Sequence, residues 1–86
     1  MEELKVPEYS KDKTLRECVV AALDHYFTQL DGYDTSDLYQ LVIQEVEKPL
    51  LETVMREAGG NQSRAATMLG MSRSTLRKKL AQHELN

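Results

Sequence analysis

Residues 60–81 read GNQSRAATMLGMSRSTLRKKLA, and this stretch decides the fold of the C-terminal part of the chain. Asn61 is a favourable N-cap residue, because its side chain can accept a hydrogen bond from the first turn of a helix. Asn61 therefore predicts the start of a short helix over residues 62–69. Gly70 ends that helix, since glycine adopts positive φ at little cost, and the chain turns there.

A second helix follows directly, from Arg73 to about Gln82, with Ser72 as its N-cap. Short helices separated by a glycine turn predict a helix-turn-helix. Ala66 supplies the small residue that is needed where the helices touch. The apolar residues expected to hold the helices together are Ala65, Leu69, Met71, Leu76 and Leu80.

The helix over residues 73–82 is polar and basic on its outer side. By helical periodicity, the side chains that point away from Leu76 and Leu80 are Ser74, Thr75, Lys78 and Ala81, flanked by Arg77 and Lys79. Such a helix can enter the major groove of DNA, while basic side chains and helix N-termini bind phosphates. The alternative is an amphipathic helical hairpin without a DNA role, because helix-glycine-helix patterns are common.

The distribution of charge favours the DNA-binding interpretation. The whole chain has a net charge of −3, which by itself argues against nucleic acid. Residues 1–58 hold six Lys/Arg and thirteen Asp/Glu, whereas residues 59–86 hold five Lys/Arg and one Glu, giving net charges of −7 and +4. Such asymmetry indicates an acidic body that carries a basic contact surface.

Length and composition exclude several other classes of protein. A chain of 86 residues forms one domain at most, and 41% hydrophobic with 29% charged residues is typical of a soluble globular protein. The longest apolar run, over residues 18–23, is far shorter than the roughly 20 residues of a membrane span. The acidic start predicts no signal peptide, and a single cysteine allows neither an internal disulfide nor a cysteine metal site. We therefore expect a small cytosolic protein without a membrane segment, metal or cofactor.

A flexible arm and a first long helix are expected upstream. Residues 1–13 show no sustained periodicity and predict the arm. Thr14 and Glu17 match a capping box, which starts the helix, and residues 31–34 carry the turn signal that ends it. The apolar stripe of this helix consists of Leu15, Cys18, Val19, Ala22, Tyr26 and Leu30.

A second long helix is expected over residues 37–58, kinked at Pro49. Its candidate caps are Asp34, Thr35 and Ser36. Apolar residues lie on more than one side of this helix, which predicts burial on more than one side. A helical hairpin cannot cover such a helix alone, whereas a second copy of the chain can, and this predicts a homodimer.

The predicted fold class is therefore all-α, with four helices. Residues 14–58 would form a helical hairpin for dimerisation, and residues 59–86 the helix-turn-helix, within a single domain. The residues expected in the dimer core are Val19, Tyr26, Leu38, Val42, Val46, Leu50 and Val54.

The same residues closely resemble a known family. The stretch GNQSRAATMLGMSRSTLRKKL, residues 60–80, resembles the C-terminal motif of the Fis family, bacterial factors for inversion stimulation. The resemblance continues upstream through YFTQLDG (26–32), DLYQLV (37–42) and EVEKPLL (45–51), and includes the proline within the second helix. It covers about residues 14–86, nearly the whole chain.

This resemblance implies an all-helical homodimer whose first two helices intertwine and whose last two helices form the DNA-binding unit. The recognition helices of such a dimer stand closer together than one DNA turn, so the duplex bends and its A/T-rich centre narrows. Arg73 would contact a guanine edge, and Ser72 would lie beside the bases. Thr75 and Lys78 would contact base or backbone. The phosphate contacts implied by the resemblance are Asn61, Ser63, Arg64, Arg77 and Lys79.

The resemblance also implies a cytoplasmic, nucleoid-associated regulator of transcription, an activator with RNA polymerase as a further partner. The chain departs from the family pattern in two places. Ala81, Gln82 and Glu84 stand where well-studied members carry basic residues, so weaker contacts to flanking DNA are expected. Pro7 and the four acidic residues of the arm match poorly to the β-hairpin that activates DNA invertases, which counts against a DNA invertase as partner.

Other interpretations remain open. The DNA-binding domain of nitrogen-regulator-type enhancer-binding activators shares the pattern Gly-Asn-x-x-x-Ala-Ala-x-x-Leu-Gly, but those domains follow an ATPase module, and this chain starts with its own methionine. A helical interaction module without DNA affinity would leave the basic C-terminal helix unexplained. An enzyme is not expected, because His25 and His83 have no nucleophile or ligand at matching spacing.

Overall fold

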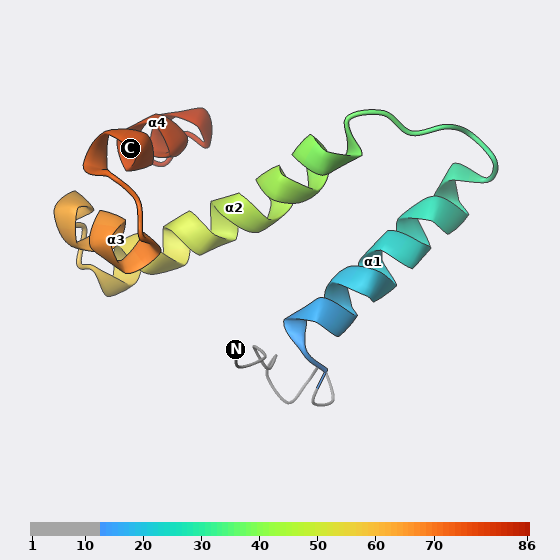
Figure 1. The fold of residues 1–86 in the computed structure, drawn as a ribbon, viewed down its shortest axis with the longest axis horizontal. Coiled ribbons are helices and arrows are strands. Elements are labelled where there is room, and N and C mark those ends of the chain that lie inside the picture. Colours follow the sequence, from blue (N-terminus) through green and yellow to red (C-terminus); the bar gives the residue numbers. More distant parts are fainter. Residues whose placement is uncertain (1–12) are drawn as a thin grey trace. The chain divides into compact units, whose positions relative to one another are not determined.

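The computed structural model describes residues 13–86, so the predicted arm lies outside the described residues except for Lys13. Four α-helices and no β-strand are present among these residues (Figure 1). The predicted all-α class is therefore confirmed. The helices are α1 (Leu15–Leu30), α2 (Leu38–Glu57), α3 (Gln62–Leu69) and α4 (Arg73–Gln82). The chain divides into two compact units between Ser36 and Asp37, so that α1 belongs to the first unit and α2, α3 and α4 to the second.

Helix α1 starts at the predicted capping box. The Glu17 backbone N–H donates to Thr14 Oγ1 at 3.1 Å, and the Thr14 N–H donates to Glu17 Oε1 at 3.1 Å. Asp31 ends the helix in the left-handed conformation, with φ 49°. Past this turn, the hydroxyl groups of Tyr26 and Thr35 are hydrogen-bonded at 2.8 Å.

The start of α2 differs from the prediction. Its N-cap is Asp37, which adopts a left-handed conformation and makes no side-chain capping bond. The predicted caps Asp34, Thr35 and Ser36 are wrong. Of these, Thr35 already uses its hydroxyl in the bond to Tyr26. The helix continues through Pro49 to Glu57, and Leu51 is its one fully buried residue.

A glycine pair reverses the chain between α2 and α3. Gly59 and Gly60 adopt positive φ of 64° and 83°, and the Gly60 N–H donates to the Met55 carbonyl at 3.0 Å. Asn61 then caps α3, as predicted, by accepting a hydrogen bond from the Arg64 N–H at 3.0 Å.

The core of the second unit lies where α2, α3 and α4 meet. Leu51, Leu76 and Leu80 are its largest fully buried side chains. Full burial of one leucine contributes about 1.5–3 kcal/mol, so these three fix α4 against its neighbours. The rest of this core consists of Ala58, Ala65 and Ala66, with Val54, Met55, Leu69, Met71 and Leu85 packed around them. The predicted contact at Ala66 is confirmed.

The long helices leave apolar side chains open in the single chain. Helix α1 has no buried residue. Of the predicted dimer core, Val46 is 42% and Leu50 is 47% exposed. The half-buried members are Val19, Tyr26, Leu38, Val42 and Val54. Their role in a dimer stays a prediction.

Candidate nucleic-acid interface

The turn between α3 and α4 sets the position of the outer helix. Gly70 has a φ of 76°, and its N–H donates to the Thr67 carbonyl at 3.1 Å. The following N–H, of Met71, donates to the carbonyl of Ala66 at 3.0 Å. These bonds satisfy carbonyls at the end of α3 and direct the chain into α4. Leu76 and Leu80 then bury one side of α4 and leave the other side to solvent.

The N-terminus of α4 presents a cluster of hydroxyl groups. Ser72 is the N-cap, and its Oγ accepts a hydrogen bond from the Thr75 N–H at 3.1 Å. The same Oγ lies 2.9 Å from Thr75 Oγ1 and 3.2 Å from Ser74 Oγ. The Ser72 hydroxyl is thus engaged within the helix end. Arg73, the first residue of α4, is exposed beside it.

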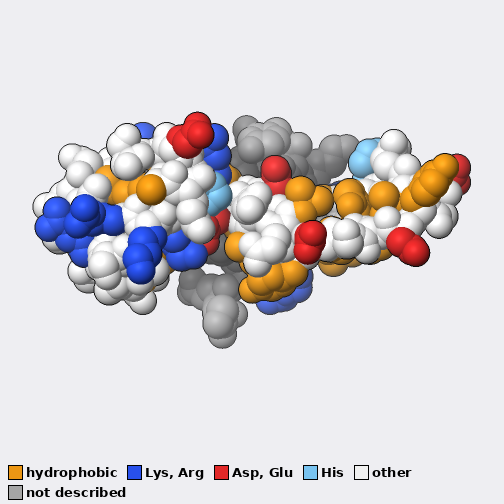
Figure 2. All heavy atoms as spheres, turned by 90° about the horizontal axis from the view of Figure 1, so that it is seen from above, with side chains coloured by type: hydrophobic (Ala, Val, Ile, Leu, Met, Phe, Trp, Pro, Cys, Tyr) orange, Lys and Arg blue, Asp and Glu red, His pale blue; other side chains and the backbone are white. Residues whose placement is uncertain are grey.

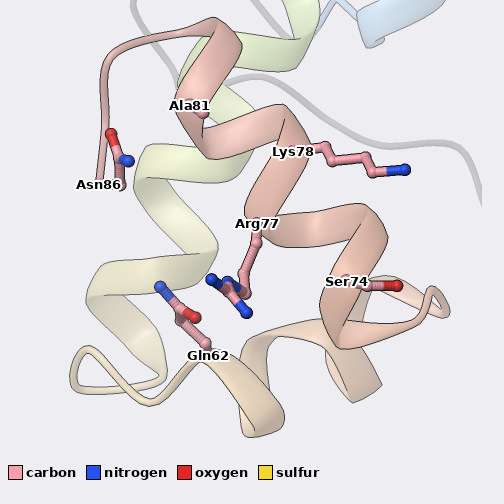
Figure 3. Close-up of a pocket in the computed structure, with 6 residues that line it drawn as sticks. All are labelled: Gln62, Ser74, Arg77, Lys78, Ala81 and Asn86. Atoms are coloured by element: carbon pink, nitrogen blue, oxygen red, sulfur yellow. The ribbon is translucent and has the colours of Figure 1, made fainter.

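The outer side of α4 carries exposed cations in more than one direction. Ser74 and Lys78 point the same way, one turn apart, whereas Arg77 extends toward Gln62 of α3 (Figure 3). Arg77, Lys78 and Ser74 line a hollow of about 380 Å³ together with Gln62, Ala81 and Asn86. Helix periodicity thus predicted the direction of Lys78 and the flanking position of Arg77.

The N-terminus of α3 adds a second set of polar groups. Asn61, Ser63 and Arg64 are exposed there, and the Asn61 side chain is held by its capping bond to the Arg64 N–H. A helix N-terminus carries partial positive charge and free N–H groups, which favour phosphate. Lys and Arg side chains gather over the helix-turn-helix, α3 and α4 (Figure 2).

Lys79 differs from the other predicted DNA contacts because it already has an anionic partner. Its Nζ lies 2.8 Å from Glu47 Oε2, and His83 Nε2 lies 2.8 Å from Glu47 Oε1. The hydrogen bond from Lys79, and then that from His83, hold the pKa of the Glu47 carboxyl below its ordinary value. Glu47 was not predicted from the sequence, because it lies 32 positions before Lys79 in the chain, farther than any helical or strand periodicity reaches.

Family comparisons match both units of the chain. A model described as "Bacterial regulatory protein, Fis family" matches residues 42–83, and one described as "DNA-binding protein Fis N-terminal domain" matches residues 2–35. Proteins named DNA-binding protein Fis from Yersinia enterocolitica, Enterobacter sp. (strain 638) and Pectobacterium carotovorum are each 57% identical over 74 residues. That alignment covers 86% of this chain and 76% of each relative. The chain belongs to the Fis family.

Two families were considered for the helix-turn-helix, Fis and the nitrogen-regulator-type activators, and the comparisons separate them. The match to the Fis N-terminal domain over residues 2–35 lies outside the motif shared with nitrogen-regulator-type activators, and therefore favours Fis. Within residues 13–86, no His, Cys, Asp and Glu side chains form a group of three or more that could hold a metal. None of the helices in this part of the chain has the length and apolar character of a membrane span.

Proposed function

We propose that this Fis-family DNA-binding protein acts as a homodimer that binds and bends double-stranded DNA and regulates transcription. The observation that supports this most strongly is the helix-turn-helix itself. Leu76 and Leu80 are fully buried, while the opposite side of α4 presents hydroxyl groups and cations. Relatives that are 57% identical are named DNA-binding protein Fis.

The residues of the helix-turn-helix divide into two proposed roles. Arg73 reads a guanine edge from the first turn of α4, because an exposed arginine there can donate two parallel hydrogen bonds to guanine. Ser72 lies beside the bases as the cap of α4, and Thr75 and Lys78 contact base or backbone. The residues proposed to hold phosphates are Asn61, Ser63, Arg64, Arg77 and Lys79.

Dimerisation is proposed because the long helices leave apolar surface open. Val46 and Leu50 of α2 are 42% and 47% exposed, and Val20 and Phe27 of α1 are 54% and 51% exposed. Exposed apolar side chains on the helices that lie outside the helix-turn-helix are suited to packing against a second copy. A symmetric dimer would then present two copies of α4 to one duplex.

The proposed setting is that of a nucleoid-associated regulator in the cytoplasm, with an A/T-rich, bendable centre in its sites. RNA polymerase is a further proposed partner. A DNA invertase is not proposed: Pro7 and the four acidic residues of the arm depart from the pattern of an invertase-activating hairpin, although the Fis N-terminal domain matches residues 2–35.

Binding to a duplex across a salt series tests this function. We expect tight, dimeric binding that weakens steeply with salt, since each phosphate contact releases counterions. A scrambled duplex of equal length is the control for specificity. A dimer without DNA affinity at low salt would contradict the proposal and indicate a helical interaction module.

A further inference from the structure

Glu47 occupies an unusual place beside the DNA-binding helix. It lies on α2, outside the helix-turn-helix, yet its two carboxylate oxygens contact Lys79 of α4 and His83 just beyond it, each at 2.8 Å. The Glu47 side chain is 17% exposed, that of Lys79 32% and that of His83 10%. An ion pair that is partly shielded from water is screened by salt less than an exposed one.

The apolar core also holds α4 in place. Leu51, Leu76 and Leu80 are fully buried and already fix α4 against α2. Beside this packing, the carboxylate has an electrostatic effect: it neutralises Lys79, a cation of the helix-turn-helix. Its lowered pKa keeps Glu47 ionised at neutral pH, so this neutralisation persists under ordinary conditions.

We infer that Glu47 limits DNA affinity by competing with the DNA phosphate for Lys79. This inference rests on the proposed function. A phosphate that reaches Lys79 must displace a carboxylate, so this exchange of one anion for another releases fewer counterions than contact with a free cation.

The surroundings of the cluster permit this exchange. Lys79 lines a hollow of about 510 Å³ between α2 and α4, whose walls also include Glu47, His83 and Gln82. The lysine stem thus has space to move, and His83 retains a bond to Glu47 when Lys79 leaves. The carboxylate is then not left without a partner, which would carry a large cost for a shielded charge.

Glu47→Gln tests the inference, because glutamine keeps the shape and removes the charge. We expect Glu47→Gln to bind DNA more tightly than the parent. The slope of log K against log salt concentration should be steeper by about 0.9 per protomer. For a dimer, the ratio of the DNA affinity of Glu47→Gln to that of the parent should then fall about tenfold between roughly 50 and 200 mM salt. Glu45→Gln is the matched control: Glu45 lies on the same helix, is exposed and forms no ion pair within residues 13–86. An equal gain in both variants would reduce the effect to net charge and overturn the inference.

Lys79→Ala separates competition from a purely structural role of Glu47. Its effect on DNA affinity is measured in the parent and in Glu47→Gln, and a purely structural role would leave the two effects equal. We expect its cost to DNA affinity to be at least about threefold larger in the Glu47→Gln background than in the parent, because only there is the lysine free. Equal costs in both backgrounds would overturn the inference.

A second test compares variants of Lys79 and Lys78 only, so it does not depend on whether Glu47→Gln folds. In the parent, Lys79→Gln should cost less affinity than Lys78→Gln, whose lysine is exposed. An equal or larger cost at Lys79 would contradict the competition. If the parent shows no salt-sensitive DNA binding, the proposed function fails; if the parent binds and the variants differ from these results, only the inference fails.

Discussion

At the scale of single residues, Arg73 carries sequence discrimination in the proposed complex. A bidentate contact to guanine contributes roughly 1–3 kcal/mol and would occur once per protomer. Arg73→Ala should therefore lose most of the preference for a specific over a random duplex. Because Arg73 is exposed, the unfolding midpoint should stay unchanged. Competition binding with both duplexes checks this, and parent-like discrimination by the variant would show that Arg73 does not read the bases.

Glu47 predicts an acid-dependent contribution to stability. Hydrogen bonds from Lys79 and His83 lower the pKa of its carboxyl below the ordinary 4.5. A carboxyl whose pKa is lowered by folding stabilises the fold above its unfolded pKa, and this stabilisation is lost as pH falls through the folded value. Glu47→Gln should therefore be less stable than the parent at neutral pH, with the difference shrinking in acid.

Urea unfolding between about pH 7 and pH 3 measures this difference. Glu45→Gln serves again as the control, since no ion pair joins Glu45 to another residue in the described part of the chain. A stability difference for Glu47→Gln that stays constant over this pH range would contradict a charge-based role for the carboxylate.

At the scale of elements, the turn at Gly70 couples α3 to α4. Gly70 has a φ of 76°, and a Cβ added there would meet nothing within 4 Å. The cost of Gly70→Ala is therefore backbone strain alone, about 1–2 kcal/mol. Gly70→Asn should cost less, because asparagine tolerates the left-handed conformation better than alanine. Chemical unfolding measures both, and equal stability of the parent and Gly70→Ala would contradict this account of the turn.

The same elements show how far sequence alone determines the structure. The starts of α3 and α4 were predicted because their N-caps, Asn61 and Ser72, accept hydrogen bonds from N–H groups only three residues away. The start of α2 was not, because Thr35 is bonded to Tyr26, nine residues earlier, instead of capping the helix. The pair between Glu47 and Lys79 arises from packing of α4 on α2, which no local pattern reports. The outward direction of Lys78, by contrast, followed from periodicity alone.

At the scale of the whole molecule, the proposed dimer predicts which exposed apolar residues matter. Leu50 is 47% exposed in the single chain and belongs to the predicted dimer core. Leu50→Glu should therefore dissociate the dimer and abolish tight DNA binding, because a charge would be buried in the interface. Met68, 50% exposed on α3, gives the control: Met68→Gln should remain dimeric. Sedimentation equilibrium measures both, and a dimeric Leu50→Glu variant would contradict the proposed interface.

DNA bending is the property that the proposed dimer must show. A site of about 27 base pairs with an A/T-rich centre can be placed at different positions along fragments of constant length. Circular-permutation gel shifts then report bending as a mobility that depends on the position of the site. We expect the lowest mobility when the site is central, because paired α4 helices would bind by bending the duplex. Tight binding with a mobility independent of site position would contradict it.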